Sequence, residues 1–146
     1  MRRTHIAVFQ ILLCSLLSAA CNHIGPKFST TYPPPPTTSY RVESVSLKLD
    51  VRVQEIRAAF VKPEFMQAVH VQPLLGRNFI EEEYFPKSQG VALLSYRLWR
   101  QRYGSDPQIV GMNVDLNSRP YTVVGILPEA FKHPEQVEIW LPDQTK

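Results

Sequence analysis

The residue with the clearest chemistry in this sequence is Cys21, whose thiol can carry a covalent modification. The chain has only one other cysteine, Cys14, which lies within an apolar stretch near the N-terminus. Cleavage just before Cys21 would leave a mature chain with a single cysteine. Such a chain cannot form an internal disulfide, and an odd cysteine in an exported protein needs another role.

The residues before Cys21 have the layout of a secretory signal peptide. Arg2 and Arg3 provide a positive start, residues 6–17 are mostly apolar, and small residues occupy positions 18–20. The apolar stretch is shorter than the about 20 residues that span a bilayer. Residues 17–21 (LSAAC) resemble a bacterial lipobox, with Ser18 where leucine is usual. We therefore predict a signal peptide at 1–20 and lipid attachment at Cys21; simple secretion and an uncleaved membrane anchor remain the alternatives.

No other residues have the spacing of a catalytic, cofactor or metal site. The histidines are isolated, and the sequence contains no G-x-x-x-x-G-K-[ST] phosphate loop and no Cys/His zinc pattern. Residues 81–83 are three glutamates, a run typical of a solvated surface. The serines considered as nucleophiles lie outside G-x-S-x-G and S-x-x-K contexts, and they are Ser88, Ser95, Ser105 and Ser118. We therefore expect a protein that is not an enzyme, and an enzyme with a hidden site is the least favoured reading.

The charge balance argues against nucleic acid as a partner. The sequence has 16 Lys and Arg against 13 Asp and Glu, and Arg2 and Arg3 would leave with a signal peptide. The remaining excess of positive charge is too small to indicate a basic binding surface.

Residues 21–44, between the predicted signal peptide and the ordered domain, have the composition of a linker. Pro33 to Pro36 are consecutive and favour an extended polyproline II conformation, and the surrounding Thr and Ser residues add no core. We expect a Pro-rich extended linker.

From residue 45 to residue 53 apolar and polar side chains alternate, which predicts a half-buried strand. The phase then slips, so we predict a bulge near Gln54–Glu55, with two strands joined by a tight turn as the alternative.

The rest of the chain predicts short alternating elements. Helices are expected at 63–70 and at 96–103, the second with Ser95 as its N-cap and Gly104 at its end. Strands are expected at 91–94, 112–116, 121–126 and 137–141, with a loop at 74–79. Asn117 to Pro120 predict a hairpin turn, for which a longer loop is an alternative because Ser118 replaces the usual glycine. The fold class is α+β, with a mainly antiparallel or mixed sheet and two short helices in an ordered domain at 45–146.

Four segments in this order resemble a known family. They read PLLGRNF, VALLSYRLWRQRYGSDPQIVG, DLNSRPYTVVGILPEAF and VEIWLP, and they lie between Pro73 and Pro142. Together with the upstream run 58–73 they resemble the periplasmic core domain of MacB-like and FtsX-like ABC transporter permeases. In that family an Asn-Gly pair usually stands where this chain has Asn117-Ser118.

The resemblance implies a non-catalytic extracytoplasmic part of an ABC-type export (efflux) system, either an accessory subunit or a fragment of a permease. It implies ABC permease or ATPase subunits, or a periplasmic adaptor, as partners, and a periplasmic location at a membrane. The family segment usually begins further upstream with another strand and helix. We therefore expect an unpaired sheet edge, and with it a partner strand or self-association. The alternative is a free-standing lipoprotein that binds a ligand or peptide in a pocket lined by Trp99, Tyr96 and Phe79.

Overall fold

A sheet of seven strands organises the computed structural model, which describes residues 32–145. The strands are β1 (Tyr40–Leu49), β2 (Arg52–Val61), β3 (Leu75–Gly76), β4 (Val91–Leu94), β5 (Asn113–Leu116), β6 (Arg119–Ile126) and β7 (Ile139–Pro142). The helices are α1 (Pro63–Val69) and α2 (Tyr96–Arg102), with 3-10 turns at Thr37–Ser39, Glu81–Tyr84 and Pro107–Ile109. The α+β class with two short helices and a mixed sheet is therefore confirmed.

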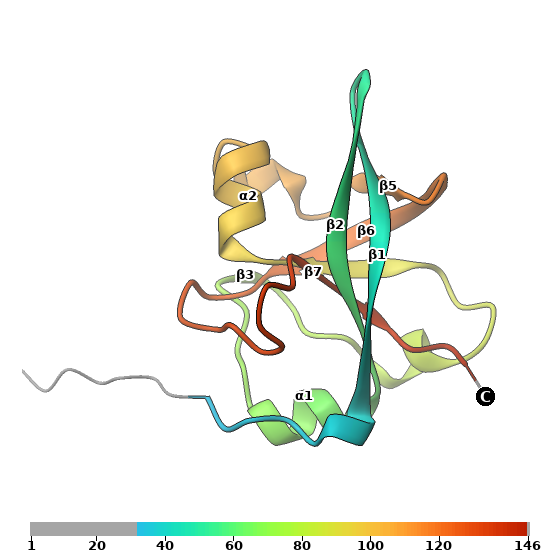
Figure 1. Ribbon diagram of the computed structural model, residues 1–146, viewed down its shortest axis with the longest axis vertical. Helices are drawn as coiled ribbons and strands as arrows, with labels where there is room; N and C mark the ends of the chain where they lie inside the picture. The colour runs from blue at the N-terminus through green and yellow to red at the C-terminus, as the bar shows by residue number, and fades with distance from the viewer. Residues whose placement is uncertain (1–31, 146) are drawn as a thin grey trace, which may run out of the picture.

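The sheet closes on itself. Its strand order is β3-β6-β4-β7-β2-β1-β5, and β5 pairs again with β6, so all strands except β3 form a ring. The pairs β2–β7 and β4–β6 are parallel and the others antiparallel. Figure 1 shows the β1–β2 hairpin running along the length of the molecule, with its turn projecting beyond the rest of the sheet.

Every strand of the ring contributes to one apolar cluster, the ring core, and α2 covers it with Leu98 and Trp99. The ring core consists of Val45, Leu47, Ile56, Ala58, Ala92, Leu94, Leu98, Trp99, Val114, Leu116, Val123, Ile126, Ile139 and Leu141. Because side chains alternate along a strand, the opposite faces of β2, β4 and β7 are left to a second cluster.

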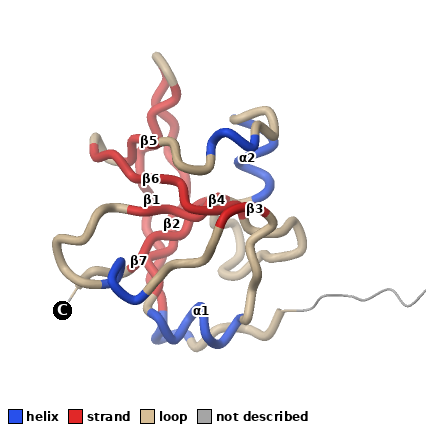
Figure 2. Tube along the Cα trace, turned by 180° about the vertical axis from the view of Figure 1, so that it is seen from behind, coloured by secondary structure: helices blue, strands red, loops and turns tan. Residues whose placement is uncertain are grey.

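This second cluster, the outer core, is covered by α1 through Phe65 and Val69. It consists of Ala59, Val61, Phe65, Val69, Val71, Val91, Leu93, Val124, Leu127, Phe131, Val137 and Trp140. Figure 2 shows from behind that α1 and α2 lie at separate ends of the sheet. Strand β4 contributes to both clusters, and all four of its residues are buried.

The helix boundaries agree with the sequence to within one residue. Pro63 occupies the first turn of α1, and His70 closes the helix with a left-handed backbone (φ 48°). Ser95 caps α2, its Oγ accepting a hydrogen bond from the Leu98 N–H at 3.0 Å. Beyond α2, Gly104 adopts φ 59°, a conformation that glycine reaches at low cost.

The prediction for residues 45–56 is wrong in its geometry. The chain turns at Asp50–Val51 and returns as β2, so there is no bulged continuous strand, and the tight-turn alternative applies at a different position. Asp50 makes this possible because its backbone is left-handed (φ 49°), a conformation that Asp tolerates better than most residues. Strand β1 also begins at Tyr40, inside the segment expected to be linker.

The predicted hairpin turn at Asn117–Pro120 is confirmed, and one smaller difference concerns the expected loop at 74–79. The β5–β6 hairpin has the tight two-residue connection, with Asn117 at φ 49° and Ser118 at φ 63°, so the longer loop does not form. Asn117 is held there because its N–H donates to the Ser46 carbonyl at 2.9 Å and its Oδ1 accepts the Ser46 N–H at 2.8 Å. Within the expected loop at 74–79, residues Leu75–Gly76 form the short strand β3 against β6. The expected signal peptide, Cys21 and the start of the linker lie outside the described residues.

Candidate functional site

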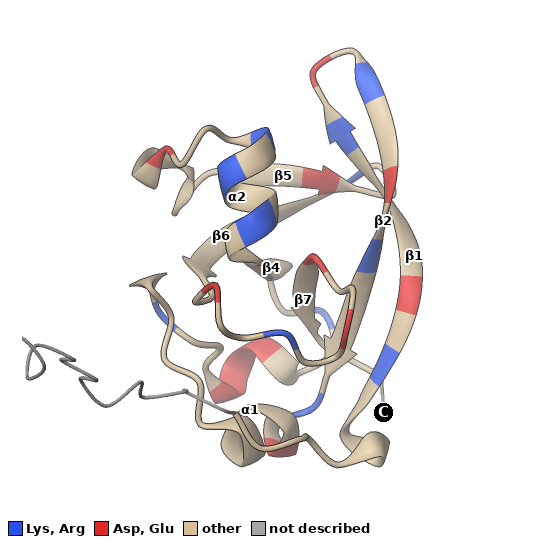
Figure 3. Cartoon of the chain, turned by 60° about the vertical axis from the view of Figure 1, so that its left-hand side comes forward, with Lys and Arg blue, Asp and Glu red and all other residues tan. Residues whose placement is uncertain are grey.

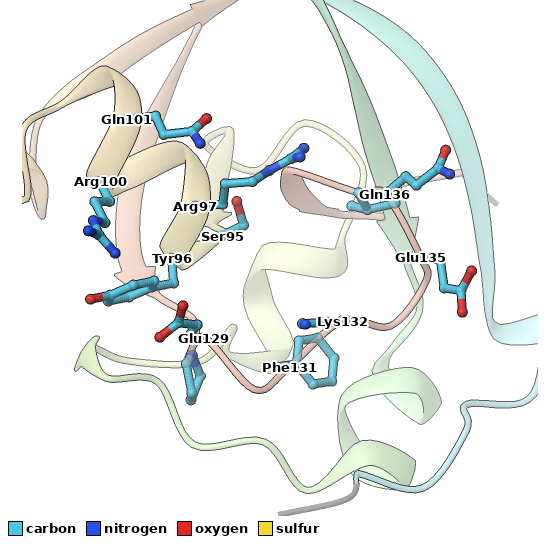
Figure 4. Close-up of a pocket in the computed structure, with 12 residues that line it drawn as sticks. Ser95, Tyr96, Arg97, Arg100, Gln101, Glu129, Phe131, Lys132, Glu135 and Gln136 are labelled. Atoms are coloured by element: carbon cyan, nitrogen blue, oxygen red, sulfur yellow. The ribbon is translucent and has the colours of Figure 1, made fainter.

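An open groove of about 750 Å³ lies between α2 and the segment 128–137 that leads from β6 to β7. Figure 4 shows side chains from both walls around this space. The groove is lined by Ser95, Tyr96, Arg97, Arg100, Gln101, Pro128, Glu129, Phe131, Lys132, Glu135, Gln136 and Val137.

The wall formed by α2 follows from its helical periodicity. Leu98 and Trp99 are buried in the ring core, so the side chains of Tyr96, Arg97 and Arg100 are left for the groove. The Trp99 indole Nε1 donates to the Asp106 carbonyl at 2.8 Å, which joins the helix to the turn that follows it.

The opposite wall has no regular secondary structure and is anchored by aromatic contacts. Phe131 is buried, and its ring centroid lies 5.6 Å from that of Trp140 on β7. The Trp140 Nε1 donates to the His133 carbonyl at 3.0 Å. The segment is therefore held to the outer core at its middle, while the charged residues beside Phe131 stay exposed.

The groove has charges of both signs. Arg97 forms an ion pair with Glu138 at 2.8 Å. Arg100, Lys132 and Glu129 are exposed and form no ion pair with any residue in the range 32–145. A shallower hollow beside β2 shares Arg97 and Gln136 with the groove and extends its polar surface. Such a surface suits a polar or mixed-charge protein segment, because exposed charges of both signs select for complementary ones.

The described residues of the groove do not form a catalytic set. Ser95 is the groove's one aliphatic hydroxyl, and its Oγ is already engaged as the cap of α2. No histidine lines the groove to act as its base. Across residues 32–145 no group of three His, Cys, Asp or Glu side chains is placed to hold a metal ion.

The pocket expected from Trp99, Tyr96 and Phe79 does not form as a unit. Tyr96 lines the groove, and its ring lies 5.8 Å from that of Trp99, but Trp99 is buried. Phe79 packs instead against Tyr84 at 6.0 Å, next to the outer core. Arg97 and Arg100 of α2 line the groove, and no sequence motif had marked them as site residues. The sequence offered no signal for the groove, because its two walls, α2 and residues 128–137, are far apart in the chain.

A second region with exposed chemistry is the end of the β1–β2 hairpin. Val51 is 97% exposed and Val53 67% exposed, although both are β-branched apolar residues. Figure 3 colours basic and acidic positions along the ribbon of the same hairpin end. Apolar side chains in such a setting can contribute to a protein contact.

One buried carboxylate stands near the start of this hairpin. Burial by itself would raise the pKa of Asp143, but hydrogen bonds from the Thr145 hydroxyl and N–H, together with Arg41, outweigh it and hold the pKa below the ordinary value. Arg41 reaches Asp143 at 3.5 Å, and its guanidinium lies 4.1 Å from the centre of the Phe60 ring. This carboxylate therefore has a structural role between β1 and the end of β7.

Comparisons with solved structures show where this fold occurs. The extracellular domain of the noncanonic ABC-type transporter YknZ from Gram-positive bacteria matches at 17% identity and a TM-score of 0.60, covering 72% of this chain and 52% of that one. The periplasmic region of MacB from Actinobacillus actinomycetemcomitans matches at 14% identity and a TM-score of 0.57, covering 73% of this chain and 47% of that one. The chain thus spans about half the length of these structures. No curated protein shows significant similarity to it.

Within residues 32–145 no helix has the length and apolar character needed to cross a bilayer. The family model described as the MacB-like periplasmic core domain matches residues 26–146, which is most of the sequence. Because that match covers far more than half of the chain, and the fold agrees with it, the chain belongs to the family of MacB-like periplasmic core domains.

Proposed function

We propose that this chain is a non-catalytic, extracytoplasmic component of an ABC-type export system and that it works through protein–protein contacts. The match to the MacB-like periplasmic core domain over residues 26–146 is the observation that carries this proposal. The mixed charge of the groove and its lack of a nucleophile–base pair support it, since they suit contact better than catalysis.

The partners that we propose are ABC permease or ATPase subunits, or a periplasmic adaptor protein. The groove between α2 and residues 128–137 is the surface that we assign to this contact. Arg100 and Lys132 come from opposite walls and form no ion pair with described residues, so both are available to carboxylates of a partner.

A photo-reactive phenylalanine analogue at Tyr96, which lines the groove, tests this contact in cells of a Gram-negative host that also express a MacB-type permease and its adaptor. We expect a crosslink to one of these proteins from position 96. The same analogue at Tyr121, which is also half-buried but does not line the groove, provides the control. Equal crosslinks from both positions, or none to an export component, would exclude the groove as the contact.

Charge reversal gives a second and independent test. Arg100→Glu should reduce the position-96 crosslink at least about tenfold, because it replaces an exposed positive charge of the groove with a negative one. Arg102→Glu is the matched control, since Arg102 is also an exposed arginine of α2 but does not line the groove. If the two variants behave alike, the contact is not made through the groove.

We also propose that Cys21 carries a lipid and tethers the protein to a membrane on the periplasmic side. The lipobox-like residues 17–21 support this proposal. Mass spectrometry of the protein from membranes of a Gram-negative host should give a triacylated Cys21 at the N-terminus, and Cys21→Ala should abolish the modification. An intact Met1 N-terminus would mean an uncleaved anchor instead.

A free-standing lipoprotein that binds a ligand or peptide is the second candidate. The size of the groove and the presence of Tyr96 beside the apolar Phe131 favour it, because pockets of about 300–1,000 Å³ hold small molecules or short segments. In that case the position-96 probe would capture no export component, and the triacylated Cys21 would be unaffected.

A further inference from the structure

Strand β1 is paired along its whole length on one side only. On that side Tyr40 to Leu49 face β2 in continuous register. On the other side β5 pairs only with Leu47 and Lys48, and Asn117 bonds to Ser46. No strand among residues 32–145 pairs with this second side between residues 40 and 45. Figure 3 shows β1 at the margin of the molecule, so we define its outer edge as residues 40–45.

The hydrogen-bond pattern shows which backbone groups face outward from this edge. The N–H and C=O of Ser46 both bond to Asn117, away from β2. In an antiparallel pair these directions alternate, so the groups of Val42 and Ser44 face the same way as those of Ser46. The β1–β2 register has no irregularity that would change this phase. None of the residues from 32 to 145 forms a hydrogen bond outside the sheet ladder with Val42 or Ser44.

Two bonds on β2 confirm the phase independently. The carbonyls of Arg57 and Val61 accept hydrogen bonds from Glu138 and Asp143 on the side away from β1, at 3.0 and 2.8 Å. In the β1–β2 register Arg57 lies opposite Ser44 and Val61 opposite Tyr40. Residues that face each other in an antiparallel pair direct their backbone groups either both toward or both away from the partner strand. The backbone groups at even positions of β1 therefore point away from β2. The outer edge thus presents the donors and acceptors of a strand that lacks its neighbour.

The side chains of this edge are complementary to themselves. In an antiparallel copy centred on Val42, Arg41 lies opposite Glu43 of the second copy, and Glu43 lies opposite its Arg41. Val42 then faces Val42 of the second copy in a hydrogen-bonded pair, which matches the outward direction of its backbone groups. Oppositely charged residues at facing positions stabilise a strand pair, and like charges destabilise it.

These charges are accessible and already lie on one face of the sheet. The side chains of Arg41 and Glu43 are 40% and 51% exposed, and the two form an ion pair within the chain. The contacts of Arg41 with Phe60 and Asp143 keep its guanidinium on this face. A second copy in the register described would extend the pair into a cluster of four alternating charges.

We propose that two copies of this chain pair antiparallel through the outer edges of β1, with the two-fold axis at Val42. A second copy fits the edge better than an unrelated strand, because the sequence Arg-Val-Glu is complementary to itself. When a second copy runs antiparallel, each Arg41 faces a Glu43 and each Glu43 faces an Arg41. This pairing does not depend on the proposed transport role, because none of residues 40–45 lines the groove between α2 and residues 128–137.

Charge variants of the full chain in detergent, followed by sedimentation, test the register. Arg41→Glu and Glu43→Arg each place like charges opposite one another twice per dimer, so each should weaken the dimer at least about tenfold. Mixing the two variants should restore a dimer containing one copy of each, because every facing pair is then of opposite sign. Glu43→Arg keeps the contact of Arg41 with Asp143, and thermal unfolding of each variant identifies any loss of folding.

Cysteine crosslinking in membranes tests the two-fold axis. Val42→Cys should give a disulfide-linked dimer on oxidation, because the facing Cα atoms of a hydrogen-bonded pair lie about 5.5 Å apart, within the range of a disulfide. Lys48→Cys is the control on the same face of β1, and residue 48 is too far from its own copy in this register. The unsubstituted chain measures the background from Cys14 and Cys21.

Three results would overturn the proposal. The first is a monomeric parent chain at about millimolar concentration, and the second is a dimer unaffected by either charge variant. The third is a Val42→Cys product crosslinked to a different protein, which would mean that the outer edge of β1 binds another protein and not a second copy. A failure of the groove crosslink at Tyr96 with an intact dimer would reject only the transport contact, so the two proposals fail separately.

Discussion

The ring around β4, β6 and β7 and the projecting end of the β1–β2 hairpin belong to one sheet but use apolar residues differently. All four residues of β4 are buried, and β6 has partner strands on both of its edges. At the hairpin end Val51 and Val53 are largely exposed, and the outer edge of β1 has no partner within the described chain. The closed part therefore buries its apolar side chains, whereas the hairpin leaves apolar side chains and a strand edge exposed.

The largest expected effect tests the closed part at Trp140. This side chain is 1% exposed, packs against Phe131 and bonds to the segment that forms one wall of the groove. Trp140→Ala should lower the free energy of unfolding by about 3–5 kcal/mol, because it leaves a cavity and an orphaned carbonyl. Urea unfolding followed by the fluorescence of Trp99 measures it.

Met112→Ala is the control for this prediction, since Met112 is 57% exposed and its loss should change stability by less than about 0.5 kcal/mol. A small effect of Trp140→Ala would show that the outer core does not hold the closed part together, and the contrast between the two regions would be lost.

Gly76 in β3 should give the next largest effect. Its φ of 75° disfavours other residues, and an added Cβ would lie 2.1 Å from the Val124 carbonyl oxygen. Gly76→Ala should therefore cost about 2 kcal/mol through strain and clash. Gly104→Ala separates the two causes, because Gly104 also has a positive φ (59°) but no heavy atom within 4 Å of its added Cβ. If Gly76→Ala and Gly104→Ala lower the free energy of unfolding equally in chemical denaturation, then backbone strain alone accounts for the loss and the close packing of β3 on β6 does not contribute.

The elements with strong local signals were predictable from the sequence. Ser95 and Gly104 bound α2, Pro63 begins α1, and the apolar run 91–94 forms a buried strand, as each pattern predicted. The family resemblance was also confirmed. Such features depend on residues within one or two turns of each other, so a single sequence contains the information.

The failures involve residues whose local and tertiary preferences compete. Val51 and Val53 continue the alternation of β1, so they predicted one long strand, yet the left-handed Asp50 starts a turn. The hairpin turn at Asn117–Ser118 is not one of these failures, since it was predicted, and the bonds from Asn117 to Ser46 hold it in place although Ser118 lacks the flexibility of glycine. The groove could not be predicted, because Arg100 and Lys132 lie far apart in the sequence and come to line one groove only through the tertiary packing of Phe131 and Trp99.

A smaller effect is expected from pH at Asp143, which joins the start of the hairpin to the closed part. The folded-state pKa lies below the unfolded value of about 3.9, so the carboxylate stabilises the fold above about pH 4. This contribution is lost as pH falls through the folded pKa. Asp143→Asn should flatten the decline in unfolding free energy below pH 4, and Thr145→Val should give an intermediate slope because it removes one hydroxyl donor.

Unchanged acid profiles in both variants would mean that Arg41 and Asp143 do not couple the hairpin to the closed part. The two regions would then be less connected than their contact at 3.5 Å indicates.

The smallest effect is expected at the hairpin end, and it decides whether the two regions differ as argued. Val53→Thr should change the free energy of unfolding by less than about 0.5 kcal/mol, because Val53 is already in water. Val45→Thr is the matched control, since Val45 lies on the same hairpin but is 3% exposed in the ring core, where a new hydroxyl costs about 1–3 kcal/mol. Thermal and urea unfolding of both variants would measure the contrast. Equal losses would mean that the exposed valines also stabilise the fold, whereas a loss confined to Val45→Thr leaves the hairpin end free to serve as a contact surface.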